Sequence, residues 1–348
     1  MKTFVVLLLA GGDSSERDVS LSSSRGIARA LREAGHRVLV ADPAQPRVTP
    51  TEYDDAIFDG AAIGVEPPRI GADVDAARAS FVRMLAARAD WDFDVVFNGL
   101  HGGAGENGTL QAVLDYLRIP YTGSGAAASA LAMDKQRAKI IAAAAGVPVP
   151  QGLHVERSAL AAGTLEQQVR ETLGLPVVVK PNAQGSSVGL SLVHSFAEFD
   201  AAARLAFDVD ETILIERYIE GREITQAILE GAPDLPLLEI KPKSGFYDYF
   251  HKYQAGNSEY LVPAPVDERI ARDVLISSKR AFAALGLSIY TRLDFRLDPE
   301  GRHYLLEANT LPGMTAMSLV PKAAGAVGIS YTELCDRIVR ASLARFNS

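Results

Sequence analysis

The sequence predicts an α/β (α+β) protein with more than one domain, and three observations support this fold class. The apolar residues 4–10 lead into Gly11 and Gly12 and then into a helical segment, which is the strand, loop and helix order of an α/β unit. Further along the chain, short strand-like runs alternate with helical patterns. The length of 348 residues is enough for two or three domains of ordinary size.

The first part of the chain, to about residue 120, is predicted to alternate buried strands with helices. Its elements are a strand at 4–10, a helix from near Ser22 to Gly35, a strand at 94–100, a Gly-rich turn at 101–108 and a helix at 109–117. Residues 42–75 carry many prolines and acidic side chains and predict peripheral loop.

The N-terminal apolar run also imitates a secretory signal, because Lys2 precedes it. The run is at the minimum length for such a signal and enters an α/β unit. We therefore predict a cytoplasmic protein, and no stretch of the sequence is long enough to span a membrane.

The rest of the chain predicts two further regions with strands of their own. A helix at 133–145, ended by Gly146 and Pro148, leads into them. The predicted elements that follow are strands at 176–180 and 187–193 joined by a turn, a helix at 196–206, strands at 212–216, 223–229 and 237–240, a polar loop to about 260, a helix at 267–285, strands at 292–295 and 304–309, and an amphipathic helix at 331–339.

Composition excludes several classes of protein. A formal net charge of -8 argues against a nucleic-acid partner, since phosphate backbones need a basic surface. The single cysteine, Cys335, excludes an intrachain disulfide and gives no metal-ligand spacing. Its place in an amphipathic helix predicts a core position rather than a reactive thiol.

The strongest chemical signal lies on the last two predicted strands. Side chains alternate between the faces of a strand, so Arg292 and Asp294 share one face, as do Glu307 and Asn309. If these strands pair, two carboxylates, an amide oxygen and a guanidinium converge, and such oxygen ligands suit Mg²⁺. The alternative is a sheet edge with solvated charges. The loop at 310–315, rich in backbone amides that can face an anion, favours a site.

Three weaker signals point to phosphate and ligand binding. Lys180 ends an apolar strand before a Gly-Ser-Ser turn, which is typical of a lid over nucleotide phosphates, although a hairpin explains the glycine equally well. Glu16 and His101 both follow strands of the first region, where open α/β sheets place ligands. Their alternatives are a capping residue and a structural histidine. The aromatic loop 246–253 indicates either a lid or a packed surface cluster.

Taken together, these residues resemble the D-alanine–D-alanine ligases of the ATP-grasp superfamily along nearly the whole chain. Five runs in order carry the resemblance, and it is their joint order and spacing that is specific. They are residues 11–20, residues 100–103 with 105–106, residues 121–125 continuing at 132–135, residues 179–181 with 185–189, and residues 292–321.

The resemblance implies three domains, at 1–125, 126–218 and 219–348, with ATP held between two antiparallel-rich sheets. It implies ATP-dependent joining of two D-alanines through a D-alanyl phosphate, for peptidoglycan precursor synthesis. It also implies ATP and two Mg²⁺ ions (with Mn²⁺ as an alternative) as cofactors, and a homodimer. No nucleic-acid or membrane partner is expected.

The resemblance also assigns roles to individual residues. The matched nucleotide positions are Lys135, Lys180, Ser186, Glu216, Arg217, Tyr218, Ile219, Glu223 and Lys252. The matched Mg²⁺ ligands are Asp294, Glu307 and Asn309, with Glu307 bridging. The matched catalytic positions are Glu16, Ser186, Tyr253, Arg292 and Gly313, and the substrate-binding ones are Glu16, His101, Lys252, Arg292, Ser318 and Leu319.

Two departures from the family pattern bear on substrate choice and on charge. Gln184 stands where many relatives have a glutamate, and His251 where a small residue is common. Tyr253 favours a dipeptide over a depsipeptide product. The alternatives are an ATP-grasp ligase for another substrate and a catalytically silent nucleotide-binding protein, and the presence of Glu16, Ser318 and Arg292 argues against them.

Overall fold

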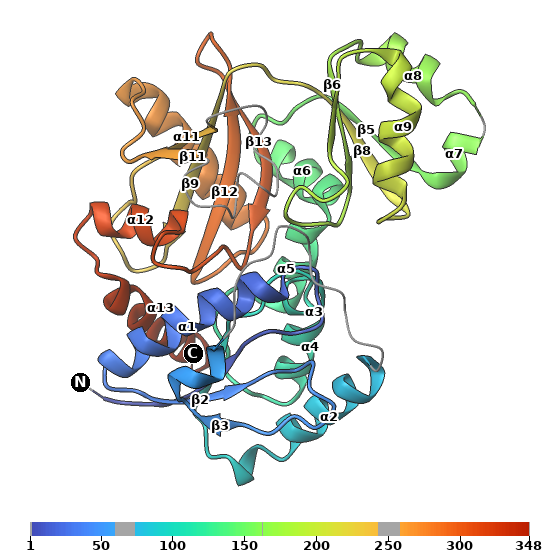
Figure 1. The fold of residues 1–348 in the computed structure, drawn as a ribbon. Coiled ribbons are helices and arrows are strands. Elements are labelled where there is room, and N and C mark those ends of the chain that lie inside the picture. Colours follow the sequence, from blue (N-terminus) through green and yellow to red (C-terminus); the bar gives the residue numbers. More distant parts are fainter. Residues whose placement is uncertain (1, 60–73, 162, 243–257, 348) are drawn as a thin grey trace.

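The computed structural model describes residues 2–59, 74–161, 163–242 and 258–347 (Figure 1). In these residues the strands form three sheets, one largely parallel and two antiparallel. The predicted mixed α/β class is therefore confirmed. The three sheets surround a common centre, and the last helix returns to pack beside the first one (Figure 1).

The first sheet has the strand order β3-β2-β1-β4, with β1 parallel to both of its neighbours. Leu7 and Leu9 of β1 pack into one core and Val6 and Leu8 into another, because helices cover both faces. The apolar start of the chain is thus a central strand. The elements are β1 (Val5–Leu9), α1 (Arg17–Glu33), β2 (Arg37–Ala41), β3 (Thr51–Glu52), η1 (Asp55–Phe58), α2 (Val74–Ala86), η2 (Arg88–Asp90), β4 (Val95–Asn98), α3 (Gly103–Glu106) and α4 (Thr109–Tyr116).

The first helix begins at Arg17, so the predicted start near Ser22 was wrong. Several serines of α1 are buried, so polar residues occupy positions of the helix that are usually apolar. The apolar spacing expected of a helix is therefore hidden in this segment. The Ser20 hydroxyl donates to the Gly99 carbonyl at 2.7 Å and accepts from the Gly11 amide at 2.9 Å. These bonds fix the glycine turn to the helix and place Glu16 directly before the first helical residue.

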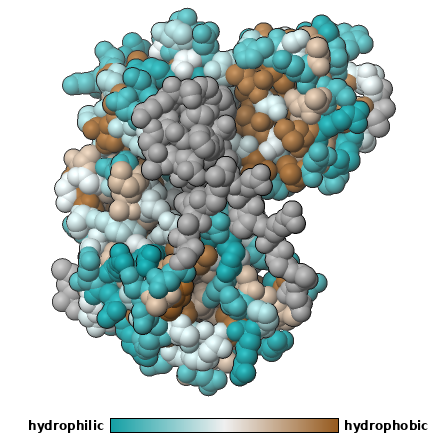
Figure 2. All heavy atoms as spheres, viewed as in Figure 1, coloured by the Kyte–Doolittle hydropathy of each residue, from teal (hydrophilic) through white to brown (hydrophobic). Residues whose placement is uncertain are grey.

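The second sheet, β5-β8-β6-β7, is antiparallel. Val177 and Val179 pack on α9, so the alternate residues Val178 and Lys180 face the other way. Apolar side chains gather over this part of the molecule, at the upper right of Figure 2. The elements are α5 (Ala126–Met133), α6 (Lys135–Ala144), β5 (Gly152–Glu156), α7 (Arg157–Ala161), α8 (Leu165–Thr172), β6 (Val177–Pro181), β7 (Ser191–Val193), α9 (Phe196–Phe207) and β8 (Thr212–Arg217).

Three local predictions in this region and before it need correction. The strand expected at 187–193 begins only at Ser191, because Ser186 and Ser187 adopt positive φ values of 52° and 58° and form a turn. The Gly-rich turn at 101–108 contains the short helix α3. The loop expected at 42–75 contains β3 and η1, and its residues 60–73 lie outside the described part of the chain.

The third sheet, β11-β10-β9-β12-β13, is antiparallel throughout. Leu293 and Phe295 of β12 pack against Val274 of the long helix α11, while Cys335 is buried in the core beside α1, as predicted. The elements are β9 (Arg222–Leu229), β10 (Leu238–Pro242), β11 (Ser258–Leu261), α11 (Glu268–Ala284), β12 (Tyr290–Leu297), β13 (His303–Asn309), α12 (Leu319–Ala326) and α13 (Tyr331–Asn347). Among the helices that the structure describes, we find none with the length and apolar character to cross a membrane.

Candidate active site

A cavity of about 480 Å³ opens where the three sheets meet. Its lining includes Glu16 from the first region, Lys135 and Ser186 from the second, and Arg292 and Gly313 from the third. Residues that are far apart in the sequence therefore share one space. Several of the predicted site residues are among them.

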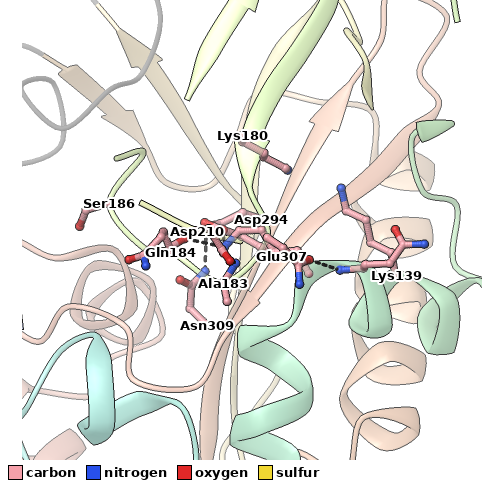
Figure 3. A network of polar contacts seen from close by, with 12 residues as sticks. Lys139, Lys180, Ala183, Gln184, Ser186, Asp210, Asp294, Glu307 and Asn309 are labelled. Carbon is pink, nitrogen blue, oxygen red and sulfur yellow. Dashed lines mark hydrogen bonds and ion pairs between the residues drawn. The ribbon is translucent and has the colours of Figure 1, made fainter. Parts of the chain in front are cut away.

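The strand pairing expected at the carboxylate pair is confirmed by the register of β12 and β13. Asp294 lies opposite Glu307, and Arg292 lies opposite Asn309. The Arg292 guanidinium donates two hydrogen bonds to the Asp294 carboxylate, at 2.8 and 2.7 Å. The Asn309 amide donates to the same carboxylate at 3.0 Å. The Thr225 hydroxyl, from β9, donates to it at 2.6 Å. Figure 3 shows Asp294, Glu307 and Asn309 in one polar network.

This donor set fits Mg²⁺ better than a metal that prefers nitrogen or sulfur. Within the described residues, no three histidine, cysteine, aspartate or glutamate side chains cluster as a complete metal cage. Mg²⁺ needs only one or two protein carboxylates and completes its shell with water and phosphate oxygens. In this structure Asp294 accepts hydrogen bonds from a guanidinium and an amide, so positively polarised groups already surround it.

Lysines face this pair from the second region. Lys135 donates to the Gln184 carbonyl at 2.6 Å and lies 3.5 Å from Glu307. Lys180 lies 2.8 Å from Glu216. The side chain of Gln184 turns away and donates to the Val209 carbonyl at 3.1 Å, so it forms part of the turn.

Glu16 and Ser186 meet across the cavity, although 170 positions separate them in the chain. The Ser186 hydroxyl donates to the Glu16 carboxylate, and both side chains are buried. A Cβ at Gly185 would lie 2.8 Å from the Glu16 carboxylate, and one at Gly102 would lie 2.6 Å from it. Glycine at these two positions thus makes room for the carboxylate, and at Gly102 it also provides a φ of 64°.

His101 lines the same cavity, as its place after β4 predicted, and both of its ring nitrogens have protein partners. Nδ1 lies 3.0 Å from the Leu311 carbonyl and Nε2 lies 3.3 Å from the Ser23 hydroxyl. Burial lowers the pKa of this imidazole, although the Glu16 carboxylate opposes the effect. His101 therefore joins the first region to the loop after β13.

The predicted nucleotide segment joins the second sheet to the third. Glu216 and Arg217 end β8, Tyr218 and Ile219 follow, and Glu223 lies on β9. Arg296 holds this segment: it donates to the Ile219 carbonyl at 3.0 Å and to the Tyr218 hydroxyl at 3.1 Å, and lies 3.8 Å from Glu223.

The loop after β13 brings Gly313, Ser318 and Leu319 to the cavity. Ser318 precedes α12, and its hydroxyl accepts a hydrogen bond from the Thr315 amide at 3.1 Å. Lys252 and Tyr253, the two predicted lid residues, lie outside the described residues.

Sequence reasoning missed four residues that contact the predicted ones or line the cavity with them. Thr225 and Arg296 have just been described, and Glu106 and Lys139 are the others. Lys139 lies one helical turn after Lys135, on the same face of α6, and that spacing is a signal that was available. Glu106 belongs to the second of the runs that carry the family resemblance, but it was given no role there.

Comparison with known proteins agrees with this geometry. Residues 5–124 match the family described as "D-ala D-ala ligase N-terminus", and residues 141–340 match "D-ala D-ala ligase C-terminus". A D-alanine–D-alanine ligase of Anaeromyxobacter dehalogenans is 40% identical over 96% of this chain and 95% of its own length. One of Halalkalibacterium halodurans is 39% identical over 98% of this chain and 99% of its own.

Solved structures resemble the fold at lower identity. The VanG D-Ala:D-Ser ligase of Enterococcus faecalis is 26% identical, with a TM-score of 0.79 over 98% of this chain and all of its own. The Bacillus anthracis D-alanine–D-alanine ligase complexed with ATP is 26% identical, with a TM-score of 0.74 over 99% of both chains. Since both halves match family descriptions and relatives near 40% identity span almost its full length, the chain belongs to the D-alanine–D-alanine ligase family.

Proposed function

We propose that this chain joins two D-alanines into D-alanyl-D-alanine with ATP, releasing ADP and phosphate, to supply peptidoglycan precursor synthesis. The observation that carries the proposal is the shared cavity. It brings a carboxylate for an ammonium group (Glu16), a cation for an oxyanion (Arg292) and the carboxylate of Glu307 into one space. Asp294 lies opposite Glu307 and pairs with Arg292. The curated relatives named above carry the same activity in their names.

The chemistry explains why these groups are needed together. A carboxylate is a poor acyl donor because its leaving group is oxide. An oxygen of the first D-alanine therefore attacks the γ-phosphorus, and the bond to ADP breaks. The amine of the second D-alanine, after losing a proton, attacks the acyl carbon, and phosphate leaves. Phosphoryl transfer of this kind depends mainly on positioning and electrostatic stabilisation.

The predicted site residues have proposed parts in these steps. Glu16 binds the ammonium of the first D-alanine, with Ser186 and Tyr253 completing a hydrogen-bonded triad. Lys135 and Lys180 neutralise phosphate charge, and Arg292 with the Gly313 amide stabilises the oxyanion.

The remaining assignments concern the metal, the nucleotide and the second substrate. Mg²⁺ held by Asp294, Glu307 and Asn309 would supply charge neutralisation at the transferred phosphoryl group. We propose that the segment from Glu216 to Ile219 holds the adenine and that Glu223 binds the ribose. The proposed groups around the second substrate are His101, Lys252, Ser318 and Leu319.

The domain division at 1–125, 126–218 and 219–348 remains a proposal, supported by the presence of one sheet in each segment. A homodimer and a cytoplasmic location also stay predictions.

D-Serine is the second candidate acceptor, because the Enterococcus structure named above is a D-Ala:D-Ser ligase. Its identity to this chain is 26%, against 40% for the Anaeromyxobacter D-alanine–D-alanine ligase, which favours D-alanine. Phosphate release with ATP and Mg²⁺ tests the choice, with D-alanine, L-alanine, D-serine, and D-alanine plus D-lactate offered in parallel. Release with D-alanine alone, and the dipeptide seen by mass, supports the proposal. Release only with another acceptor overturns the substrate.

Replacing Gly185 with alanine is expected to reduce activity more than stability. The added methyl group meets the Glu16 carboxylate at 2.8 Å, so the carboxylate or the turn must shift from its present position. We expect kcat/KM for D-alanine to fall by roughly tenfold or more, since displacements near 1 Å at a positioning group reduce rates strongly. Gly325→Ala is the matched control, because nothing lies within 4 Å of its Cβ position on α12. Equal kinetics of Gly185→Ala and wild type would contradict this packing role.

Glu106→Gln is expected to change how stability depends on pH. Burial, followed by the charge of Glu16, raises the Glu106 pKa from an ordinary 4.5 to about 7. The folded state therefore keeps a proton that the unfolded state releases, and the wild type loses stability as pH rises through that window. The variant does not lose stability in this way. The Tm of the variant minus the Tm of the wild type should therefore be more positive at pH 8 than at pH 4.5. Glu166→Gln, an exposed position on α8, serves as the control. A Tm difference independent of pH would contradict the assignment.

A further inference from the structure

We infer that Lys139 is a positioning residue for the nucleotide: it keeps Glu216 paired while Lys180 turns to the phosphates. The inference rests on the function proposed above, in which Lys180 contacts the phosphates of ATP.

The geometry gives each oxygen of one buried carboxylate its own lysine. Lys139 of α6 donates to Oε1 of Glu216, and Lys180 of β6 lies 2.8 Å from Oε2. All three residues are buried: Lys139 is 5% exposed, Lys180 7% and Glu216 4%. Figure 3 shows Lys139 on its helix and Lys180 on its strand in the same polar network as Glu307.

The arrangement gives Glu216 two lysine partners. Burial lowers the pKa of Lys139 to about 7, although the charge of Glu216 opposes the effect. Burial opposes ionisation of Glu216, but the ammonium groups of Lys139 and Lys180 outweigh it and lower its pKa to about 2. The carboxylate therefore stays charged. A buried charge left without a partner is costly, so Glu216 requires one lysine at all times.

A phosphate that attracts Lys180 removes the partner of Oε2. With Lys139 still on Oε1, the carboxylate remains paired and Lys180 is available to the nucleotide. Without Lys139, any movement of Lys180 leaves Glu216 buried and unpaired. Lys139 thus lowers the cost of nucleotide binding without touching the nucleotide.

The same helix places Lys139 beside the phosphate side of the cavity. Lys135, one turn earlier, contacts the Gln184 carbonyl of the Gly-Ser-Ser turn. The two lysines of α6 therefore act on neighbouring parts of one site. Lys135 lines the cavity, whereas Lys139 lies behind it against β8.

Lys139→Met tests the inference, because the variant should bind nucleotide more weakly without losing stability. The ligand-free variant keeps the Lys180–Glu216 pair, and methionine fills the apolar volume, so its Tm should stay close to that of the wild type. The Kd for a non-hydrolysable ATP analogue with Mg²⁺, measured by calorimetry, should rise about 10–100-fold, as expected for a hydrogen bond to a charged group. The KM for ATP should rise in parallel while that for D-alanine stays unchanged. Arg137→Met, an exposed site on the same helix, is the control.

The double variant Lys139→Met/Glu216→Gln should restore part of the nucleotide binding that Lys139→Met loses. A neutral amide at position 216 does not require an ammonium partner, so Lys180 is free again and the analogue should bind more tightly than to Lys139→Met. An unchanged Kd in Lys139→Met, or a lowered Tm with no change in Kd, overturns the inference. If the wild type fails to release phosphate with D-alanine while Lys139→Met still weakens analogue binding, the inference stands and the substrate proposal falls.

Discussion

Replacing Arg292 with methionine is expected to reduce kcat for dipeptide formation by roughly 10²–10³, the usual effect of losing one oxyanion donor. Arg292 lines the cavity and pairs with Asp294 at 2.7 Å. Both side chains are largely buried. Asp294 keeps two other partners in the variant, the Thr225 hydroxyl and the Asn309 amide, so the strand pair should persist. The measurement is phosphate release at saturating ATP and D-alanine, with Tm recorded to establish that the variant folds.

A further variant separates charge from shape at this position, and a second variant elsewhere is the control. Arg292→Lys keeps the charge but cannot form the paired contacts of a planar guanidinium, so its kcat should lie between those of the wild type and Arg292→Met. Arg204→Met, at an exposed ion pair on α9, should leave kcat unchanged. A folded Arg292→Met enzyme with wild-type kcat would remove Arg292 from the proposed machinery.

The local patterns near the carboxylate pair could be predicted from the sequence because they depend on neighbouring residues. Alternation on a strand put Arg292 and Asp294 on one face, and the register of β12 and β13 then joined them to Glu307 and Asn309. The unbroken apolar run at the start of the chain predicted a buried strand, and β1 is covered on both faces.

Contacts between distant segments could not be predicted in this way. The Lys139–Glu216 pair joins residues 77 positions apart, and its lysine resembles any surface lysine of an amphipathic helix. The buried serines of α1 read as a polar face, so the helix start was placed too late. The positive φ values of Ser186 and Ser187 are equally hidden, since few non-glycine residues adopt them. Only the family resemblance marked Ser186 as a catalytic position.

Replacing Glu307 with glutamine should impair the reaction through the metal. Glu307 lies opposite Asp294, another proposed metal ligand, and 3.5 Å from Lys135, a proposed phosphate contact. Removing its charge leaves Asp294 as the one carboxylate of the set. We expect kcat to fall by about 10²–10⁴, because metal charge stabilisation contributes several kcal/mol to phosphoryl transfer.

The concentration of Mg²⁺ distinguishes this cause from a general loss of structure. In Glu307→Gln, half-maximal phosphate release should require more Mg²⁺ than in the wild type, whereas Tm without metal should change little, since glutamine has nearly the same volume. Glu300→Gln, at an exposed position between the same two strands, should behave as the wild type in both measurements. An unchanged Mg²⁺ requirement together with a reduced kcat would assign Glu307 to the positioning of Lys135 instead. The Mg²⁺ titration therefore decides between the metal-binding and the lysine-holding role of this carboxylate.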